Sequence, residues 1–125
     1  MLLLEEITEK IISSFYTVYN TLGYGFLEKV YENSLIYELN FQELNGTGQY
    51  PIDVYYNEIK VGQYFADILV NKQIIIEVKA AETIAKEHEV QLINYLKATN
   101  FEVGLLLNFG KKPDFRRKIF SNDLK

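Results

Sequence analysis

Apolar residues recur at helical spacing through the first part of the chain. One face of the first expected helix carries Leu3, Ile7, Ile11, Phe15, Val18 and Leu22. The segment 23–25, which contains two glycines, is expected to end this helix. A second helix is predicted from residue 26 to residue 40, and the polar segment 45–48 is expected to close it off.

Strand patterns dominate the middle of the chain. The segments 51–56, 59–70 and 73–79 predict an antiparallel meander. A helical pattern returns from about residue 84 to residue 98, and the apolar run 101–108 suits a buried strand. Because this last strand follows a helical crossover, it is expected to run parallel to the strand before the helix. The order predicts an α/β fold in which a mixed sheet with an antiparallel meander is flanked by helices.

Two acids and a lysine interrupt neighbouring apolar strands. A three-residue turn, 71–73, would set Asp67 opposite Glu77 on one face, with Lys79 beside them. The other face would then be apolar, with the pairs Val70–Ile74, Ile68–Ile76 and Ala66–Val78, whereas a two-residue turn would oppose each acid to an apolar residue. Since adjacent carboxylates repel unless a cation lies between them, the pattern predicts a metal site with a catalytic lysine. The alternative is a structural ion network in which Lys79 and Lys60 pair with the acids.

Composition narrows the chemistry of this site. The length suits one domain spanning 1–125. The chain has no cysteine, so a metal must be bound by oxygen or by the lone His88, which we expect to pack or cap a helix instead. The formal net charge of -4 argues against binding nucleic acid through overall basicity. No run of about 18 apolar residues is present, which predicts a cytoplasmic protein without membrane contact.

Basic residues crowd the C-terminal segment, with one acid, Asp114, among them. They are Lys111, Lys112, Arg116, Arg117 and Lys118. The segment could form a phosphate-facing patch, although a solvated tail is the commoner meaning of such a run.

Three motifs resemble those of one nuclease superfamily. Asp67, a gap of nine residues and then Glu77-Val78-Lys79 resemble the PD-(D/E)xK signature, with Ala66 in place of its proline. The residues Gln91 and Tyr95 resemble the Q-x-x-x-Y helix element of RecB-type members. The segment Gly25-Phe26-Leu27-Glu28-Lys29-Val30-Tyr31 matches the G-x-x-E-x-x-Y motif. The chain is therefore similar to the GxxExxY protein family of that superfamily, over roughly residues 7 to 120.

The resemblance implies a restriction-endonuclease-like core and a metal-dependent nuclease, with DNA favoured over RNA as the substrate. It implies that Mg²⁺ or Mn²⁺ is held by Glu28, Asp67, Glu77 and the backbone carbonyl of Val78. The cation would polarise the phosphodiester, while Lys79 orients the attacking water or accepts its proton. On the helix that follows, Gln91 would hold the lysine or a phosphate.

Tyrosines and basic residues are the candidate substrate contacts. Tyr95 would stack on a base or position the nucleic-acid backbone, and Tyr31 is a second candidate, although both tyrosines also suit the core. The basic candidates are Lys111, Lys112, Arg116 and Arg117. Tyr19 stands where family members often carry histidine, which argues against a ligand or base from the first helix.

Two functions compete with the nuclease hypothesis. One is a non-catalytic nucleic-acid-binding or protein-binding module that keeps the fold, and the other is a metal-dependent enzyme that acts on a smaller phosphate ester. The acidic net charge favours the binding module, whereas the complete set of acids and lysine favours catalysis. A homodimer is also predicted, because so small a domain offers little surface to grip a duplex.

Overall fold

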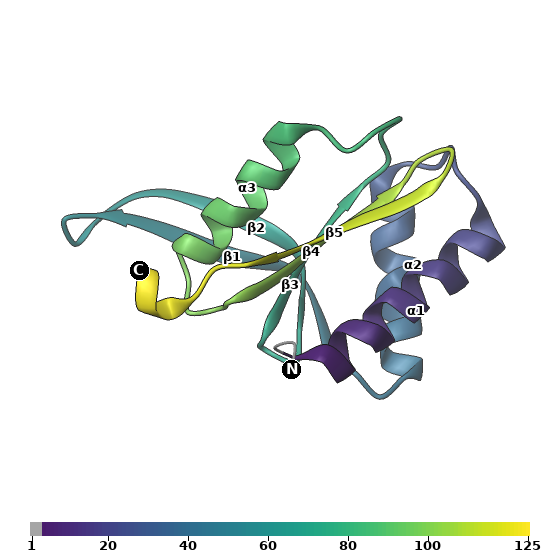
Figure 1. Ribbon diagram of the computed structural model, residues 1–125, viewed down its shortest axis with the longest axis horizontal. Coiled ribbons are helices and arrows are strands. Elements are labelled where there is room, and N and C mark those ends of the chain that lie inside the picture. Colours follow the sequence, from purple (N-terminus) through teal and green to yellow (C-terminus); the bar gives the residue numbers. More distant parts are fainter. Residues whose placement is uncertain (1–3) are drawn as a thin grey trace.

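A five-stranded mixed sheet lies between two helices on one face and one helix on the other (Figure 1). This computed structural model describes residues 4–125. In chain order the elements are α1 (Glu5–Leu22), α2 (Glu28–Phe41), β1 (Gly46–Tyr56), β2 (Ile59–Val70), β3 (Ile74–Lys79), α3 (Lys86–Lys97), β4 (Val103–Phe109), β5 (Pro113–Ile119) and a short 3-10 helix, Asn122–Leu124. The strand order is β1-β2-β3-β4-β5, with β3 and β4 parallel and the other neighbours antiparallel. The predicted α/β fold is confirmed.

Helix α1 buries the face that its apolar spacing predicts. Ile11, Phe15 and Val18 are buried against the sheet. Gly23, with a φ of 69°, follows the last helical residue, so the glycine ends the helix as expected. Helix α2 begins later than predicted, and this later start makes Glu28 its first residue.

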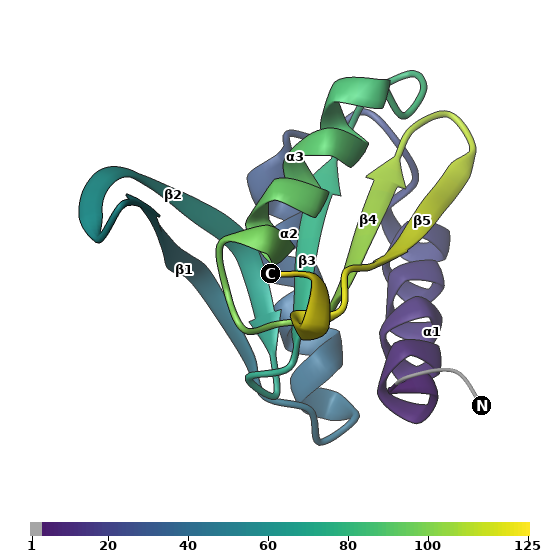
Figure 2. The ribbon, with the colours of Figure 1, turned by 60° about the vertical axis from the view of Figure 1, so that its left-hand side comes forward.

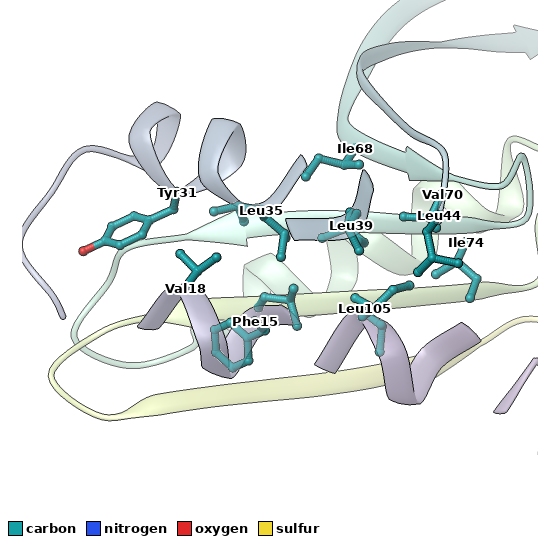
Figure 3. Close-up of a cluster of buried hydrophobic side chains, with 14 of the residues drawn as sticks. Phe15, Val18, Tyr31, Leu35, Leu39, Leu44, Ile68, Val70, Ile74 and Leu105 are labelled. Atoms are coloured by element: carbon teal, nitrogen blue, oxygen red, sulfur yellow. The ribbon is translucent and has the colours of Figure 1, made fainter. Parts of the chain in front are cut away.

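The sheet separates two apolar clusters. The inner cluster lies between the sheet and helices α1 and α2, where Phe15 and Leu35 face Ile68 and Leu105 (Figure 3). The outer cluster lies under α3 and contains Ile75, Leu92, Leu96 and Leu106. Because strands β3 and β4 are covered on both faces, their sequences are apolar almost throughout.

The register of the β2–β3 hairpin follows the predicted three-residue turn. The pairs Val70–Ile74, Leu69–Ile75 and Ile68–Ile76 lie opposite one another. Asn71 and Lys72 adopt left-handed backbone angles in the turn, with φ of 51° and 54°. Strand β4 runs parallel to β3, as the helical crossover between them predicts.

The predicted pairing of Ala66 with Val78 on one apolar face is wrong. Ala66 packs in the outer cluster, whereas Val78 and Ile68 pack in the inner one. Residues two apart in a regular strand have their side chains on the same face of the sheet. Because Ala66 and Ile68 pack on opposite faces, β2 is irregular between them. Gln49, on the neighbouring strand, has a φ of 52°, and no Gln49–Asp67 pair appears in the register of β1 and β2. The sheet therefore twists locally at Asp67.

Strand β1 begins at Gly46, earlier than predicted, so residues 46–48 of the segment that follows the second helix already belong to the sheet. A side-chain Cβ at Gly46 would lie 3.3 Å from Cδ1 of Leu39. A Cβ at Gly48 would lie 3.2 Å from Cδ1 of Ile36. Glycine at these two positions lets the strand lie close against α2.

The basic C-terminal segment is a strand at the edge of the sheet, which corrects the expectation of a solvated tail. Strand β5 pairs with β4 along its whole length, from Phe109–Pro113 to Val103–Ile119. Its run of charged residues lacks the apolar alternation that identifies a strand in a sequence. None of the helices within residues 4–125 is long and apolar enough to cross a membrane.

Candidate active site

Asp67 and Glu77 lie where strands β2 and β3 separate. The last backbone pair before the separation is Ile68–Ile76. Beyond it, the side chains of the two acids replace the sheet hydrogen bonds. The N–H of Asp67 donates to Oε2 of Glu77 (2.8 Å), and the N–H of Val78 donates to Oδ2 of Asp67 (2.7 Å). These reciprocal bonds hold the two carboxyl groups beside each other.

Burial and mutual repulsion raise the pKa values of both carboxyl groups. Burial is the main cause that raises the pKa of Asp67 to about 6, and the negative charges of Glu32 and Glu28 add to the rise. Burial also raises the pKa of Glu77 to about 8, and the charge of Asp67 adds to it. The ammonium of Lys79 opposes both shifts. A cation between the two carboxylates would stabilise their ionised forms.

The oxygen donors of the pair suit a hard divalent cation. The backbone bonds use Oδ2 of Asp67 and Oε2 of Glu77, which leaves Oδ1 and Oε1 to coordinate a further group. Mg²⁺ in proteins commonly takes one or two carboxylates and completes its coordination with water and substrate phosphate. Within residues 4–125, no group of three His, Cys, Asp or Glu side chains is placed to hold a metal ion. Asp67 and Glu77 are the two candidate protein ligands of such a cation.

Lys79, the last residue of β3, is half-buried beside the acids. The alternative ion network with Lys60 is wrong, because Lys60 pairs with Asp53 on the hairpin, with 3.2 Å between Nζ and Oδ1. Lys79 makes no ion pair within 4.0 Å among the described residues, although its charge lowers the pKa of both carboxyl groups. Its ammonium therefore remains available to a substrate or a water molecule.

The expected position of Glu28 in a set of three carboxylates is not what the structure shows. Glu28 is exposed at the start of α2 and does not join Asp67 and Glu77 in a cluster. Glu32, one helical turn further on, is only 6% exposed. Its Oε1 accepts a hydrogen bond from Nε2 of Gln49 (2.9 Å), and its charge acts more strongly on Asp67 than that of Glu28 does.

Sequence reasoning missed Glu32, and the spacing of the two acids could have identified it. Residues 28 and 32 lie on the same side of a helix, four positions apart. In the structure, residues 28–30 at the start of α2 are exposed, whereas Tyr31 and Glu32 are buried. The metal-ligand roles of Glu28 and of the Val78 carbonyl stay predictions.

Gln91 and Tyr95 of α3 are joined to each other, as their spacing suggests. Nε2 of Gln91 donates to the hydroxyl oxygen of Tyr95 (2.9 Å). Burial raises the pKa of Tyr95 to about 12, and the charges of Glu77 and Asp67 add to the rise. Tyr95 thus lies within the electric field of the acid pair, although neither α3 residue makes a hydrogen bond to an acid of that pair among the described residues.

His88 acts as a helix cap, which confirms the expectation that it caps or packs. Its Nδ1 accepts a hydrogen bond from the N–H of Ala85 at the start of α3 (3.1 Å).

Tyr31 lies in the core, so its predicted role as a substrate contact is wrong. Its ring is buried and stacks on Phe109, with 4.2 Å between the ring centroids. Its hydroxyl donates to the carbonyl of Gly23 (2.7 Å) and accepts from the N–H of Phe26 (3.2 Å). Tyr31 therefore holds the loop between the first two helices.

Tyr19 also has a structural role. Its hydroxyl lies 2.8 Å from the carbonyl oxygen of Gly110 and 2.7 Å from that of Lys111, and so anchors the β4–β5 turn to α1.

The basic residues of β5 are partly neutralised. Arg116 pairs with Asp114 (2.9 Å), and its Nε lies 4.0 Å from Oε1 of Glu89 on α3. Lys118 also pairs with Glu89, with 2.6 Å between Nζ and Oε1. Arg117 is half-buried and interacts within the protein. Of the predicted phosphate contacts, Lys111 and Lys112 lie exposed in the β4–β5 turn.

Asn108 is a residue of the site that sequence reasoning missed. It is buried on β4, opposite Lys79 in the parallel register, and its side chain binds the backbone of Ala81. A polar amide within the apolar run 101–108 is the signal that could have identified it.

These features define a class of protein. A mixed sheet flanked by helices carries a buried acid, a half-buried acid and a lysine where its central strands separate, and a glutamine–tyrosine pair lies on the adjacent helix. The family model of the PD-(D/E)XK nuclease superfamily matches residues 5–118. The chain belongs to this superfamily, and the membership suggests metal-dependent nuclease activity.

Among the solved structures that match is the crystal structure of SSO0001, with a TM-score of 0.57 and 19% sequence identity. The match covers 77% of this chain and 51% of that one, so this chain spans about half the length of SSO0001. At this level of identity the likeness supports the fold alone. A comparison with curated proteins finds no match.

Proposed function

We propose that this protein is a nuclease that hydrolyses phosphodiester bonds of DNA, and less favourably of RNA, with Mg²⁺ or Mn²⁺. The observation that carries the proposal is the pair of reciprocal hydrogen bonds between the Asp67 and Glu77 strands, which holds two repelling carboxylates together beside Lys79. The pattern of Gly25, Glu28 and Tyr31 supports a place among the GxxExxY proteins of the superfamily.

Each residue of the site has a role in this proposal. Asp67 and Glu77 would hold the cation through Oδ1 and Oε1. When bound, the cation supplies a Lewis acid that polarises the phosphodiester. Lys79 donates a hydrogen bond to the scissile phosphate or orients the attacking water, which stabilises the negative charge that develops in the transition state. Gln91 and Tyr95 position the nucleic acid next to the acid pair.

A binding module that keeps the fold is the second candidate. Two observations favour it: the net charge of -4 and the absence of a third carboxylate gathered at the pair within residues 4–125. The two candidates differ in one measurable property, since both predict cation binding at Asp67 and Glu77 but only the nuclease predicts cleavage.

The test is cleavage of single-stranded and double-stranded DNA and RNA with Mg²⁺, with Mn²⁺ and with EDTA. We expect cation-dependent cleavage that is lost in Asp67→Asn and Lys79→Ala. The asparagine retains an oxygen that can accept from the N–H of Val78, so this variant is expected to fold. Lys72→Ala, in the exposed β2–β3 turn, is the matched control and should cleave normally. Calorimetric cation binding that depends on Asp67, without cleavage of any substrate, would replace the nuclease with the binding module.

A further inference from the structure

A groove of about 1010 Å³ lies between the β1–β2 hairpin and helix α3. The hairpin projects from the sheet beside α3 (Figure 2). Val54, Tyr55 and Tyr64 line the groove on the hairpin side, and Gln91 and Tyr95 line it on the helix side. The volume is at the upper end of the range of about 300–1,000 Å³ for small-molecule pockets, which suits a segment of a polymer.

Two of the lining tyrosines expose their rings to solvent. Tyr55 is 60% exposed and Tyr64 is 51% exposed. The ring centroid of Tyr64 lies 5.7 Å from that of the buried Tyr95, at an interplanar angle of 46°. Exposed aromatic rings in a groove are stacking platforms for nucleic-acid bases. Bases in a duplex already stack on their neighbours, so these rings favour an unpaired strand.

The charged side chains of the groove suit a polyanion that is bound through only a few of its phosphates. Lys86 and Lys97 line the groove and are exposed at the first and last positions of α3, roughly 16 Å apart along the helix axis. Glu87 is the acidic side chain of the described lining. Two cations at opposite ends of the helix would contact phosphates of different nucleotides, while the tyrosines contact the bases between them.

The groove lies next to the candidate active site, because Ala66, the chain neighbour of Asp67, packs in the same outer cluster as the groove residue Tyr95. Tyr95 and Gln91 line it and are hydrogen-bonded to each other. The charges of Glu77 and Asp67 also act on Tyr95, which agrees with this proximity.

We propose that this groove binds single-stranded nucleic acid, with bases stacked on Tyr55 and Tyr64 and phosphates at Lys86 and Lys97. This proposal rests on the proposed nuclease function, because the groove would serve to direct an unpaired strand to Asp67 and Glu77. The binding itself needs no metal and can be measured without cleavage.

The test is fluorescence anisotropy with labelled oligothymidylate, oligouridylate and a DNA duplex of equal length, all in EDTA. We expect the single strands to bind more tightly than the duplex, and the two homopolymers to show whether DNA or RNA is preferred. Tyr55→Leu and Tyr64→Leu should each weaken binding about tenfold. Tyr56→Leu is the matched control: Tyr56 is 69% exposed on the same hairpin but does not line the groove, so its affinity should not change.

Salt dependence tests the lysines. The double variant Lys86→Gln with Lys97→Gln should reduce the slope of log affinity against log salt by about 1.4, or about 0.7 for each phosphate contact. Lys97 also lies over the ring of Phe120, with 5.5 Å from Nζ to the centroid, so thermal unfolding must confirm that the variant is folded. An unchanged slope in a folded variant would contradict the assignment of phosphates to these lysines.

The measurements distinguish failure of the proposed groove function from failure of the proposed nuclease function. Tighter binding of the duplex, no binding of any oligonucleotide, or affinities unchanged by Tyr55→Leu and Tyr64→Leu would overturn the groove. Binding that Tyr64→Leu weakens, without cleavage under any condition, would remove the nuclease and leave the groove.

Discussion

The side chain of Asn108 makes hydrogen bonds to both the backbone N–H and the backbone carbonyl of Ala81. The N–H of Ala81 donates to Oδ1 of Asn108, and Nδ2 of Asn108 donates to the carbonyl of Ala81, each at 2.9 Å. A Cβ on Gly110 would lie 2.4 Å from the same carbonyl oxygen, so glycine is required there. The chain is thereby fixed two residues after Lys79, where β3 ends.

Asn108→Ala should destabilise the protein and displace Lys79. It leaves the N–H and carbonyl of Ala81 without partners, which we expect to cost about 2–4 kcal/mol of unfolding free energy. Urea denaturation measures this loss. If the protein is a nuclease, kcat should fall more than KM changes, because the lysine acts in the transition state.

Asn40→Ala is the control for Asn108→Ala. Asn40 is exposed on α2, and its replacement should change stability by no more than about 0.5 kcal/mol. A stable Asn108→Ala protein with unchanged kcat would show that the amide neither holds the end of β3 nor positions the lysine.

Tyr31→Phe tests whether this tyrosine is structural. The variant keeps the ring that stacks on Phe109 but loses the hydroxyl that binds Gly23 and Phe26. We expect a loss of about 1–2 kcal/mol in unfolding free energy and no change in oligonucleotide affinity under denaturant-free conditions. Chemical denaturation and anisotropy measure the two quantities. Weaker oligonucleotide binding at full stability would restore Tyr31 as a substrate contact.

The hairpin register and the acid pair could be predicted from the sequence because both depend on local rules. The turn length and the alternation of apolar residues determine which residues of β2 and β3 face each other, and this placed Asp67 near Glu77. The change of face between Ala66 and Ile68 could not be predicted, since it arises where β1 and β2 twist together at Gln49.

Two further differences have a tertiary origin. The distinction between Glu28 and Glu32 depends on how helix α2 lies against the sheet, which a motif does not specify. Strand β5 could not be predicted from its charged sequence, which lacks apolar alternation; its charges are placed at the sheet edge, where Arg116 and Lys118 pair with Glu89 of α3.

The metal-free protein should lose stability as the pH rises. Asp67 and Glu77 have folded-state pKa values of about 6 and about 8, above their ordinary values. The folded state therefore binds more protons than the unfolded state between about pH 4 and pH 8. The contribution of these groups to stability is fully present below their unfolded pKa values and is lost as the pH rises through the folded ones.

Glu77→Gln isolates this effect. The glutamine has an oxygen that can accept from the N–H of Asp67, as Oε2 of Glu77 does, but it cannot ionise. At pH 9 in EDTA, the variant should be more stable than the unmodified protein by on the order of 2 kcal/mol. Thermal and urea unfolding from pH 5 to pH 9 measure the difference, with the exposed Glu82→Gln as control. Parallel stability curves for Glu77→Gln and the unmodified protein would argue against the raised pKa values.

Substitutions of the two acids on α2 should affect cation binding unequally. Glu32 is buried and its charge acts more strongly on Asp67 than that of the exposed Glu28. Glu32→Gln should weaken Mg²⁺ binding about tenfold, the effect expected of a charged group next to the ligands. Glu28→Gln should weaken it by less than about twofold. Isothermal titration calorimetry at one pH gives both affinities, and a larger loss in Glu28→Gln would return Glu28 to the metal site as the third carboxylate.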